Sequence, residues 1–234
     1  MSQAKYIADL LARNDMVNCN PVPTLMSYVY KSSSYQRTCD IIENVSRYKS
    51  VVEALQYIIL TRPEIAFSIN KLSQFLSCPR TQYWEACTRL LRYLKGTIHF
   101  GLQFYTYGAM QIKYFINSNC ACDRDDRKSM VGFTIYLGPN LVSWSSKKQV
   151  VVSRSRTEAN YRALSHAASE VTLIHFLLAE LHINLAIIPI LWCNNQGAIA
   201  LAYNSVYHEK TKHLELGIHS RQSCSKEGKS LLCT

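Results

Sequence analysis

The sequence is short of acidic residues and of long apolar runs. It has 234 residues, with 26 Lys+Arg against 16 Asp+Glu, so its formal net charge is +10. A run of about 18 apolar residues, the minimum for a membrane-spanning helix, does not occur, and no membrane association is expected. Eight Gly and six Pro are too few for a collagen-like or linker-like chain. The basic excess favours a polyanionic partner such as nucleic acid, and few carboxylates remain for metal chemistry.

The sequence also lacks a secretion signal and a disulfide framework. Residues 1–5 lead directly into a helical pattern, without the basic and apolar regions of a signal peptide. The nine cysteines are odd in number and scattered, so we expect reduced thiols in an intracellular protein, cytoplasmic or nuclear and not secreted. Their spacing fits no zinc module, and no small-molecule cofactor is expected.

The first part of the chain, residues 1–106, is predicted to be mostly helical. Apolar residues recur at spacings of three and four, which is typical of helices with one buried face. The expected helices lie around Tyr6–Leu11, from Tyr48 to about Leu60, from Pro63 to about Leu76 and from Gln82 to Leu94. Pro63 suits a first helical turn, and Thr81 is the expected N-cap of the last helix.

The second part, residues 107–234, changes period and predicts an α/β domain. Strands are expected at 111–116, 131–137 and 141–145, the last two joined by a tight turn at 138–140. A long helix over 156–181, a wholly apolar and therefore buried parallel strand over 187–192, and a short helix over 195–203 follow. This order of elements predicts a sheet flanked by helices.

Three places in this domain could converge at one end of the sheet. Asn117 lies in the end of the first strand, at residues 116–119, Asn194 lies in the end of the apolar strand, at residues 192–195, and Glu158 lies in the first turn of the long helix. A two-metal phosphodiesterase needs carboxylates at such a site, because they hold two divalent ions about 4 Å apart. An amide oxygen can ligate a hard cation but brings no charge, so two Asn here predict a weak metal site or none.

Several longer motifs together resemble one known family. They are QAKYI at 3–7, YLKGT at 93–97, SWSSKKQ at 143–149, SRSRTEANYRAL at 153–164, NQGAIAL at 195–201 and TKHLE at 211–215. In this order they look like the C-terminal part of the Pol polyprotein of copia-type LTR retrotransposons. Residues from about 110 to 221 resemble its ribonuclease H domain, which implies a mixed sheet flanked by helices. Residues 1–106 resemble the segment that follows the reverse-transcriptase palm.

The resemblance implies a domain that cleaves RNA in an RNA/DNA hybrid, using Mg²⁺ or Mn²⁺ held by four carboxylates. It places these carboxylates at Asn117, Glu158, Asn194 and Gly217, so only Glu158 is still an acid. We therefore expect Glu158 to be a metal ligand at most, no bound pair of ions, and no catalysis. The alternative for Glu158 is a first-turn acid that interacts with the helix dipole. After Arg221 the family pattern is lost, and an altered or truncated end is expected.

The resemblance also favours contacts with the phosphates of a hybrid duplex. The candidate residues lie on either side of the third strand, at the start of the long helix and in the Thr-Lys-His motif: Lys147, Lys148, Arg154, Arg156, Lys212 and His213. The alternative is an ordinary solvated basic surface.

Three functions stay open from the sequence. The first is a catalytically inactive ribonuclease H remnant, and the second is a non-catalytic module that binds nucleic acid or a component of an intact element. The third is an active ribonuclease H with a site rebuilt from Glu158, Glu215, Asp123 and Asp125. Basic residues alternate with Asp123 and Asp125, which is more typical of a solvated, self-paired loop.

Overall fold

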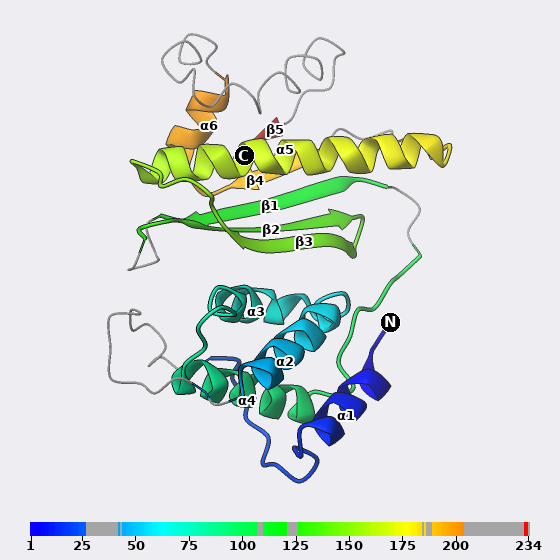
Figure 1. Ribbon diagram of the computed structural model, residues 1–234. Helices are drawn as coiled ribbons and strands as arrows, with labels where there is room; N and C mark the ends of the chain where they lie inside the picture. The colour runs from blue at the N-terminus through cyan, green and yellow to red at the C-terminus, as the bar shows by residue number, and fades with distance from the viewer. Residues whose placement is uncertain are drawn as a thin grey trace. The chain divides into compact units, whose positions relative to one another are not determined.

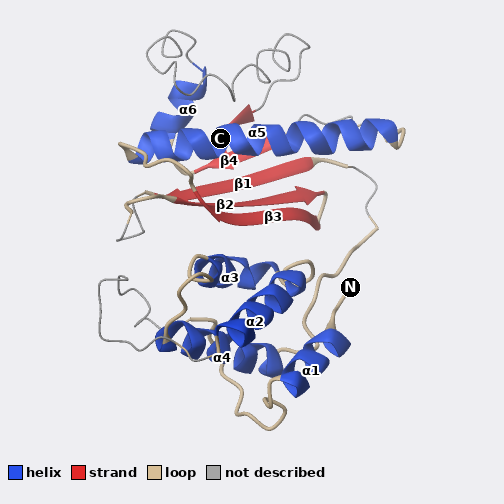
Figure 2. Ribbon diagram, in the orientation of Figure 1, coloured by secondary structure: helices blue, strands red, loops and turns tan. Residues whose placement is uncertain are grey.

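The computed structural model (Figure 1) describes residues 1–26, 42, 44–106, 110–120, 126–183, 185, 189–203 and 232–233. The chain divides into two compact units, Met1–Gln103 and Phe104–Thr234. In the described residues the first unit is helical and the second carries the sheet (Figure 2). The assignment of these parts to particular Pol domains, with a boundary between residues 106 and 107, stays a prediction. Within the described ranges, no helix is both long and apolar enough to cross a bilayer.

The described residues of the first unit form four α-helices and one 3₁₀ turn. Their bounds are α1 Ala4–Arg13, α2 Val45–Ile58, η2 Pro63–Ile65, α3 Ala66–Ser73 and α4 Thr81–Gly96. The apolar positions predicted from their spacing form one core, which includes Ile7, Leu10, Val51, Val52, Leu55, Ile69, Leu91 and Leu94. The prediction of Thr81 as the cap of the last helix is wrong. Arg80 is the N-cap, because its extended backbone directs its carbonyl to the amides of Tyr83 and Trp84.

A buried arginine joins η2 to the end of α4. Arg62 is 1% exposed, and its Nε donates to Oε1 of Glu64 at 2.6 Å. Its other nitrogens donate to the carbonyl and the hydroxyl of Thr97 at 2.9 and 2.6 Å. All three guanidinium nitrogens are therefore hydrogen-bonded, which is the condition for burying a charge at tolerable cost.

The second unit contains a mixed sheet with strand order β3-β2-β1-β4-β5. Its strands are β1 Ile112–Asn119, β2 Met130–Leu137, β3 Asn140–Lys148, β4 Ile190–Cys193 and β5 Leu232–Cys233. The first three pair in antiparallel fashion, whereas β4 runs parallel to β1 and β5 parallel to β4. The turn between β2 and β3 is the predicted one, and Gly138 provides its positive φ of 59°.

Helices α5 (Arg156–Glu180) and α6 (Gln196–Tyr203) complete the described part of this unit. In Figure 1 α5 runs along one face of the sheet, and the core between them holds Tyr114, Ile116, Phe133, Leu164, Ala167 and Val171. A buried residue of α6, Ala198, belongs to the same core. The predicted fold class, a mixed α/β sheet flanked by helices after a helical segment, is confirmed.

Only one face of the sheet is covered by these two helices. Burial alternates along β1, with Ile112, Tyr114, Ile116 and Ser118 buried and the residues between them exposed. The predicted buried strand over 187–192 is β4, and it is parallel as expected. The prediction of complete burial is wrong, because Trp192 points to the uncovered face and is 42% exposed.

Candidate functional site

Two amide side chains meet at the end of the two central parallel strands. Asn117 lies within β1 and Asn194 directly follows β4, and the register of these strands places Ile116 opposite Cys193. Both Asn residues are exposed, and Nδ2 of Asn194 donates to Oδ1 of Asn117 at 3.3 Å. The structure thus brings together two positions at which the resemblance expects carboxylates. Strand β1 ends at Asn119, within the predicted end of the strand at residues 116–119.

Glu158 holds the start of α5 together. Ser155 is the N-cap, and its hydroxyl accepts from the amide of Glu158 at 3.0 Å. One carboxylate oxygen of Glu158 accepts from the amide of Arg154 at 2.8 Å, and the other accepts from the guanidinium of Arg162 at 3.0 and 3.1 Å. The arrangement is close to a capping box, and an acid in the first turn interacts favourably with the helix dipole. These contacts support the alternative in which Glu158 is a first-turn acid that stabilises the start of α5.

The starts of α5 and α6 are in close contact near the amide pair. A Cβ built on Gly197 would lie 3.1 Å from Oγ1 of Thr157 and 3.3 Å from Oδ1 of Asn195, so a larger residue there would displace its neighbours. Asn195 in turn accepts from the amide of Ala198 at 2.9 Å, in the first turn of α6. Because Thr157 precedes Glu158 and Asn195 follows Asn194, the positions 117, 158 and 194 lie around one end of the sheet.

This set of side chains does not fit a pair of divalent ions. Two Asp residues at 117 and 194 would repel each other and require a cation, whereas two Asn satisfy one another through a hydrogen bond. Glu158 is the one acid of the three and is already bound by Arg162. In the part of the chain that the structure describes, no three His, Cys, Asp or Glu side chains gather to form a metal site.

Burial sets the protonation state of the Cys193 thiol, which lies next to the amide pair. Cys193 is buried at the end of β4, and this burial raises the pKa of its thiol, while a hydrogen bond from the backbone of Asn195 lowers it to a smaller extent. The net shift is upward. The thiol is therefore protonated at neutral pH and is poorly suited to act as a nucleophile or metal ligand.

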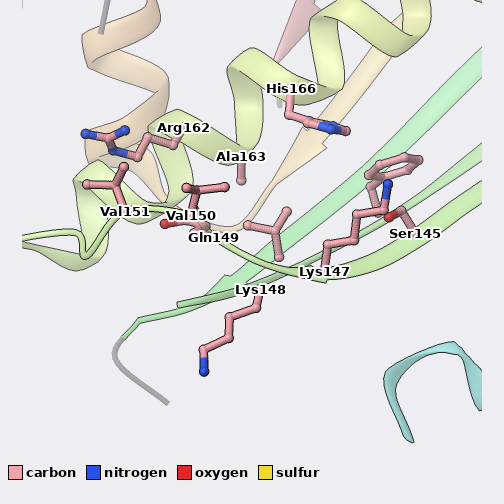
Figure 3. Close-up of a pocket in the computed structure, with 11 residues that line it drawn as sticks. Ser145, Lys147, Lys148, Gln149, Val150, Val151, Arg162, Ala163 and His166 are labelled. Carbon is pink, nitrogen blue, oxygen red and sulfur yellow. The ribbon is translucent and has the colours of Figure 1, made fainter. Parts of the chain in front are cut away.

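The two predicted phosphate-binding lysines point in opposite directions from β3. A cleft of about 280 Å³ beside β3 is lined by residues that include Phe133, Lys147 and His166. Figure 3 shows its lining residues as sticks. Lys147 is exposed. Lys148 also lines the cleft, but its side chain points away from it, and its Nζ lies 3.0 Å from a carboxylate oxygen of Asp126. Adjacent residues of a strand face opposite sides of the sheet, so the sequence neighbours do not form one patch.

Of the remaining candidate residues, two lie at the start of α5 and the others are not described by the structure. Arg154 and Arg156 are exposed on either side of the N-cap of α5, as a phosphate-binding role would require. The other predicted residues lie outside the part of the chain that the structure describes: Asp123, Asp125, Lys212, His213, Glu215 and Gly217.

Sequence reasoning missed two exposed aromatic residues beside the amide pair. Phe115 and Trp192 are opposite each other in the register of β1 and β4, each two residues before one of the paired Asn residues. Their rings are nearly parallel, at 8°, with centroids 6.1 Å apart. The signal in the sequence was the alternation along residues 112–119, which places position 115 on the same face as Asn117.

Known proteins share this sequence over nearly its whole length. The retrovirus-related Pol polyprotein from transposon RE1 of Arabidopsis thaliana is 40% identical over 219 residues, which cover 94% of this chain. The chain is a homologue of the retrovirus-related Pol polyproteins of copia-type transposons. It spans 15% of the length of the RE1 polyprotein. An uncharacterized mitochondrial protein of the same plant is 37% identical over 74% of the chain, which covers 70% of that protein.

The similarity of this Pol relative to family models and to solved structures is weaker than its similarity to the polyproteins. No protein-family model matches the chain. The solved structure of LC11-RNase H1, isolated from compost, is 14% identical, with a TM-score of 0.31, and the match covers 45% of this chain and 76% of that protein. A TM-score of this size describes a distant likeness only.

Proposed function

We propose that the second unit is the ribonuclease H domain of a copia-type Pol polyprotein, and that it binds nucleic acid but no longer cleaves it. The helical first unit is proposed to be the segment that follows the reverse-transcriptase palm. The observation that carries the loss of cleavage is the hydrogen bond between Asn117 and Asn194, at the end of the sheet where the family resemblance expects two acids.

The loss of cleavage follows from the charge requirement of two-metal chemistry. Two divalent ions must be held together, and their charge must be compensated by the protein. Asn117 and Asn194 bring no negative charge, and Glu158 is engaged by Arg154 and Arg162. Residue 217 is Gly, which has no side chain to offer a metal. A single, already paired carboxylate does not meet the requirement.

Retained affinity for nucleic acid is supported by the charge of the chain. The formal net charge is +10, and Lys147, Arg154 and Arg156 are exposed in the second unit. Contacts from such residues to phosphates position a duplex without reading its sequence, and they release counterions. The affinity should therefore fall steeply as the salt concentration rises.

The test of cleavage uses a labelled RNA/DNA hybrid incubated with the full chain in Mg²⁺ or Mn²⁺. We expect no cleavage above the level of the Glu158→Gln variant. Metal-dependent turnover that Glu158→Gln abolishes would contradict the proposal and would favour the rearranged active site instead.

The test of binding measures the affinity for the same hybrid between 50 and 200 mM salt. Replacing Lys147, Arg154 and Arg156 together by Gln should weaken binding and reduce the steepness of log K against log salt by roughly 2.7, if each residue contacts one phosphate. A triple variant with the same change of charge in the first unit, Lys5→Gln with Arg13→Gln and Lys49→Gln, is the control for net charge. An equal loss in both variants, or no binding at all, would contradict a specific nucleic-acid surface.

A further inference from the structure

We propose that the sheet face opposite α5 binds the unpaired bases of single-stranded nucleic acid, without a metal ion. This inference rests on the proposed function, because it names the surface and the class of nucleic acid that the domain binds. It concerns one set of neighbouring side chains, the aromatic–amide surface, formed by Phe115, Asn117, Tyr136, Trp192 and Asn194.

The aromatic part of this surface is exposed and arranged for stacking. Phe115 and Trp192 are each 42% exposed, although they lie on the two central strands of the sheet. The ring of Tyr136 on β2 meets Phe115 edge-on, with centroids 5.8 Å apart at 89°. In Figure 2 both described helices of this unit lie on the other side of the strands. Bases of any sequence can stack on such rings, because every base has a π-face.

The amide part of the surface lies directly beside the rings. Asn117 and Asn194 each follow an aromatic residue by two positions, so all four side chains are on the same face. The hydrogen bond between the two amides uses one N–H and one lone pair, and further donors and acceptors remain on both. Asn side chains form hydrogen bonds with the edges of bases, so a base stacked on a ring has partners for its polar edge.

The charge of this face fits a polyanion. The described residues that point to it on β1 to β4 include Lys113 and Lys148 but no acid, and Lys113 is exposed. Asp126 approaches from a turn and pairs with Lys148 at the margin. Carboxylates at 117 and 194 would repel a phosphate unless metal ions intervened, whereas the amide pair does not. The changes that weaken a metal site thus make the same face compatible with metal-free binding.

Single strands fit this surface better than duplexes. In a duplex the faces of the bases are stacked on one another and are not available to protein rings, whereas unpaired bases can be splayed onto a sheet and stacked on its aromatic residues. Phosphate contacts alone would make no such distinction. A preference for single strands therefore separates this inference from binding of a hybrid through the basic residues around α5.

The first experiment measures the affinity of the full chain for fluorescently labelled oligo(dT) and oligo(U) in EDTA. Phe115→Ala and Trp192→Ala are each expected to weaken binding roughly 5- to 150-fold, the range for loss of one stacked base. Trp192→Phe keeps a ring and should stay within about threefold of the wild type. Phe176→Ala is the matched control, because Phe176 is 62% exposed but lies on α5. Unchanged affinity of Trp192→Ala, or binding that EDTA abolishes, would overturn the inference.

The second experiment needs no variant. Oligonucleotides that carry 4-thiouridine are crosslinked to the wild-type chain, and the attachment sites are located by mass spectrometry. Crosslinks are expected within residues 113–117 and 190–194, and crosslinks confined to other segments would overturn the inference. If Trp192→Ala instead converts a dimer into a monomer in sedimentation, the surface is an interface between copies and the inference is also overturned.

The outcomes distinguish this inference from the proposed function. Hybrid binding that depends on Lys147, Arg154 and Arg156 but not on Phe115 or Trp192 would overturn the aromatic–amide surface and leave the proposed function intact. Absence of binding to hybrid, duplex and single strand alike would overturn both.

Discussion

Asn194 donates a hydrogen bond from Nδ2 to Oδ1 of Asn117 across 3.3 Å, and so joins two parallel strands through their side chains. The sequence separates these residues by 77 positions. Their contact joins the two amides by one hydrogen bond without a cation, at a place where the family resemblance expects a metal-binding pair of acids. The expected response of the second unit to divalent ions depends on this contact.

Restoring both acids should make the second unit dependent on divalent ions. The Asn117→Asp/Asn194→Asp variant places two like charges about 3–4 Å apart, which costs about 1 kcal/mol at this distance in bulk water and more where the protein excludes water. We expect its free energy of unfolding to be about 1–2 kcal/mol lower than that of the wild type in EDTA, and to recover in millimolar Mg²⁺ or Mn²⁺. Unfolding by urea with and without the metal checks this.

A control for the restored acids changes the charge by the same amount elsewhere. Asn18→Asp/Asn20→Asp alters two exposed residues of the first unit and should show no response to the metal. A wild-type chain that Mg²⁺ stabilises as much as it stabilises the Asp variant would contradict the prediction.

Glu158 should prove important for the stability of α5. Glu158→Gln removes the charge that pairs with Arg162 and interacts with the helix dipole, so we expect a loss of about 1 kcal/mol in the free energy of unfolding. Ser155→Ala removes the side-chain cap and should cost a similar amount. Glu180→Gln, in the last turn of the same helix, is the control and should be neutral or slightly stabilising. If Glu158→Gln left stability unchanged but abolished Mg²⁺ binding, Glu158 would be a ligand after all.

The buried Arg62 should be essential for folding of the first unit. Arg62→Met removes the partner of Glu64 and one of the two hydrogen bonds made by the carbonyl and by the hydroxyl of Thr97. The loss of one member of a buried pair typically costs about 3–5 kcal/mol. Because Glu64 is 35% exposed and can be solvated, we expect about 2–4 kcal/mol. Thermal unfolding measures the difference. Arg13→Met is the control, since Arg13 is exposed on α1, and an equal effect of both variants would contradict the role of Arg62.

Alkaline pH should weaken the first unit through Cys87. Burial raises the pKa of this thiol to about 12, so the folded state keeps a proton that the unfolded state loses above about pH 9. Stability is therefore unaffected below pH 9 and falls above it, by up to about 1.4 kcal/mol per pH unit from this group. Burial also raises the pKa of Tyr48, which adds to the fall above pH 10.

Urea unfolding at pH 8, 9 and 10 measures this slope. Cys87→Ala should lower stability at every pH, because it leaves a small cavity, but it should flatten the dependence between pH 9 and 10. The exposed Cys78 provides the control, since Cys78→Ala should keep the full slope. A slope that Cys87→Ala does not change would show that another group is responsible.

Much of the fold could be predicted from local patterns. The helical period over residues 45–58 and the alternation over 112–119 are repeated within a few residues, so each identifies its element without knowledge of the rest. The burial of β4 could not be predicted in this way. A short apolar run such as 190–193 looks the same whether one face or both faces are covered, and the exposure of Trp192 depends on which elements pack around the sheet.

The sequence by itself determined the family, the basic charge and the identity of the residues at positions 117, 158 and 194, because motifs and composition are properties of the chain alone. Only the tertiary structure decided what those residues do. Pairing of β1 with β4 brings Asn117 and Asn194 into contact, and the turn before α5 places the amide of Arg154 on Glu158. The same pairing sets Phe115 beside Trp192. The physical reason is that hydrogen bonds and ring contacts need distances of a few ångströms, which between distant residues only strand register and helix packing can set.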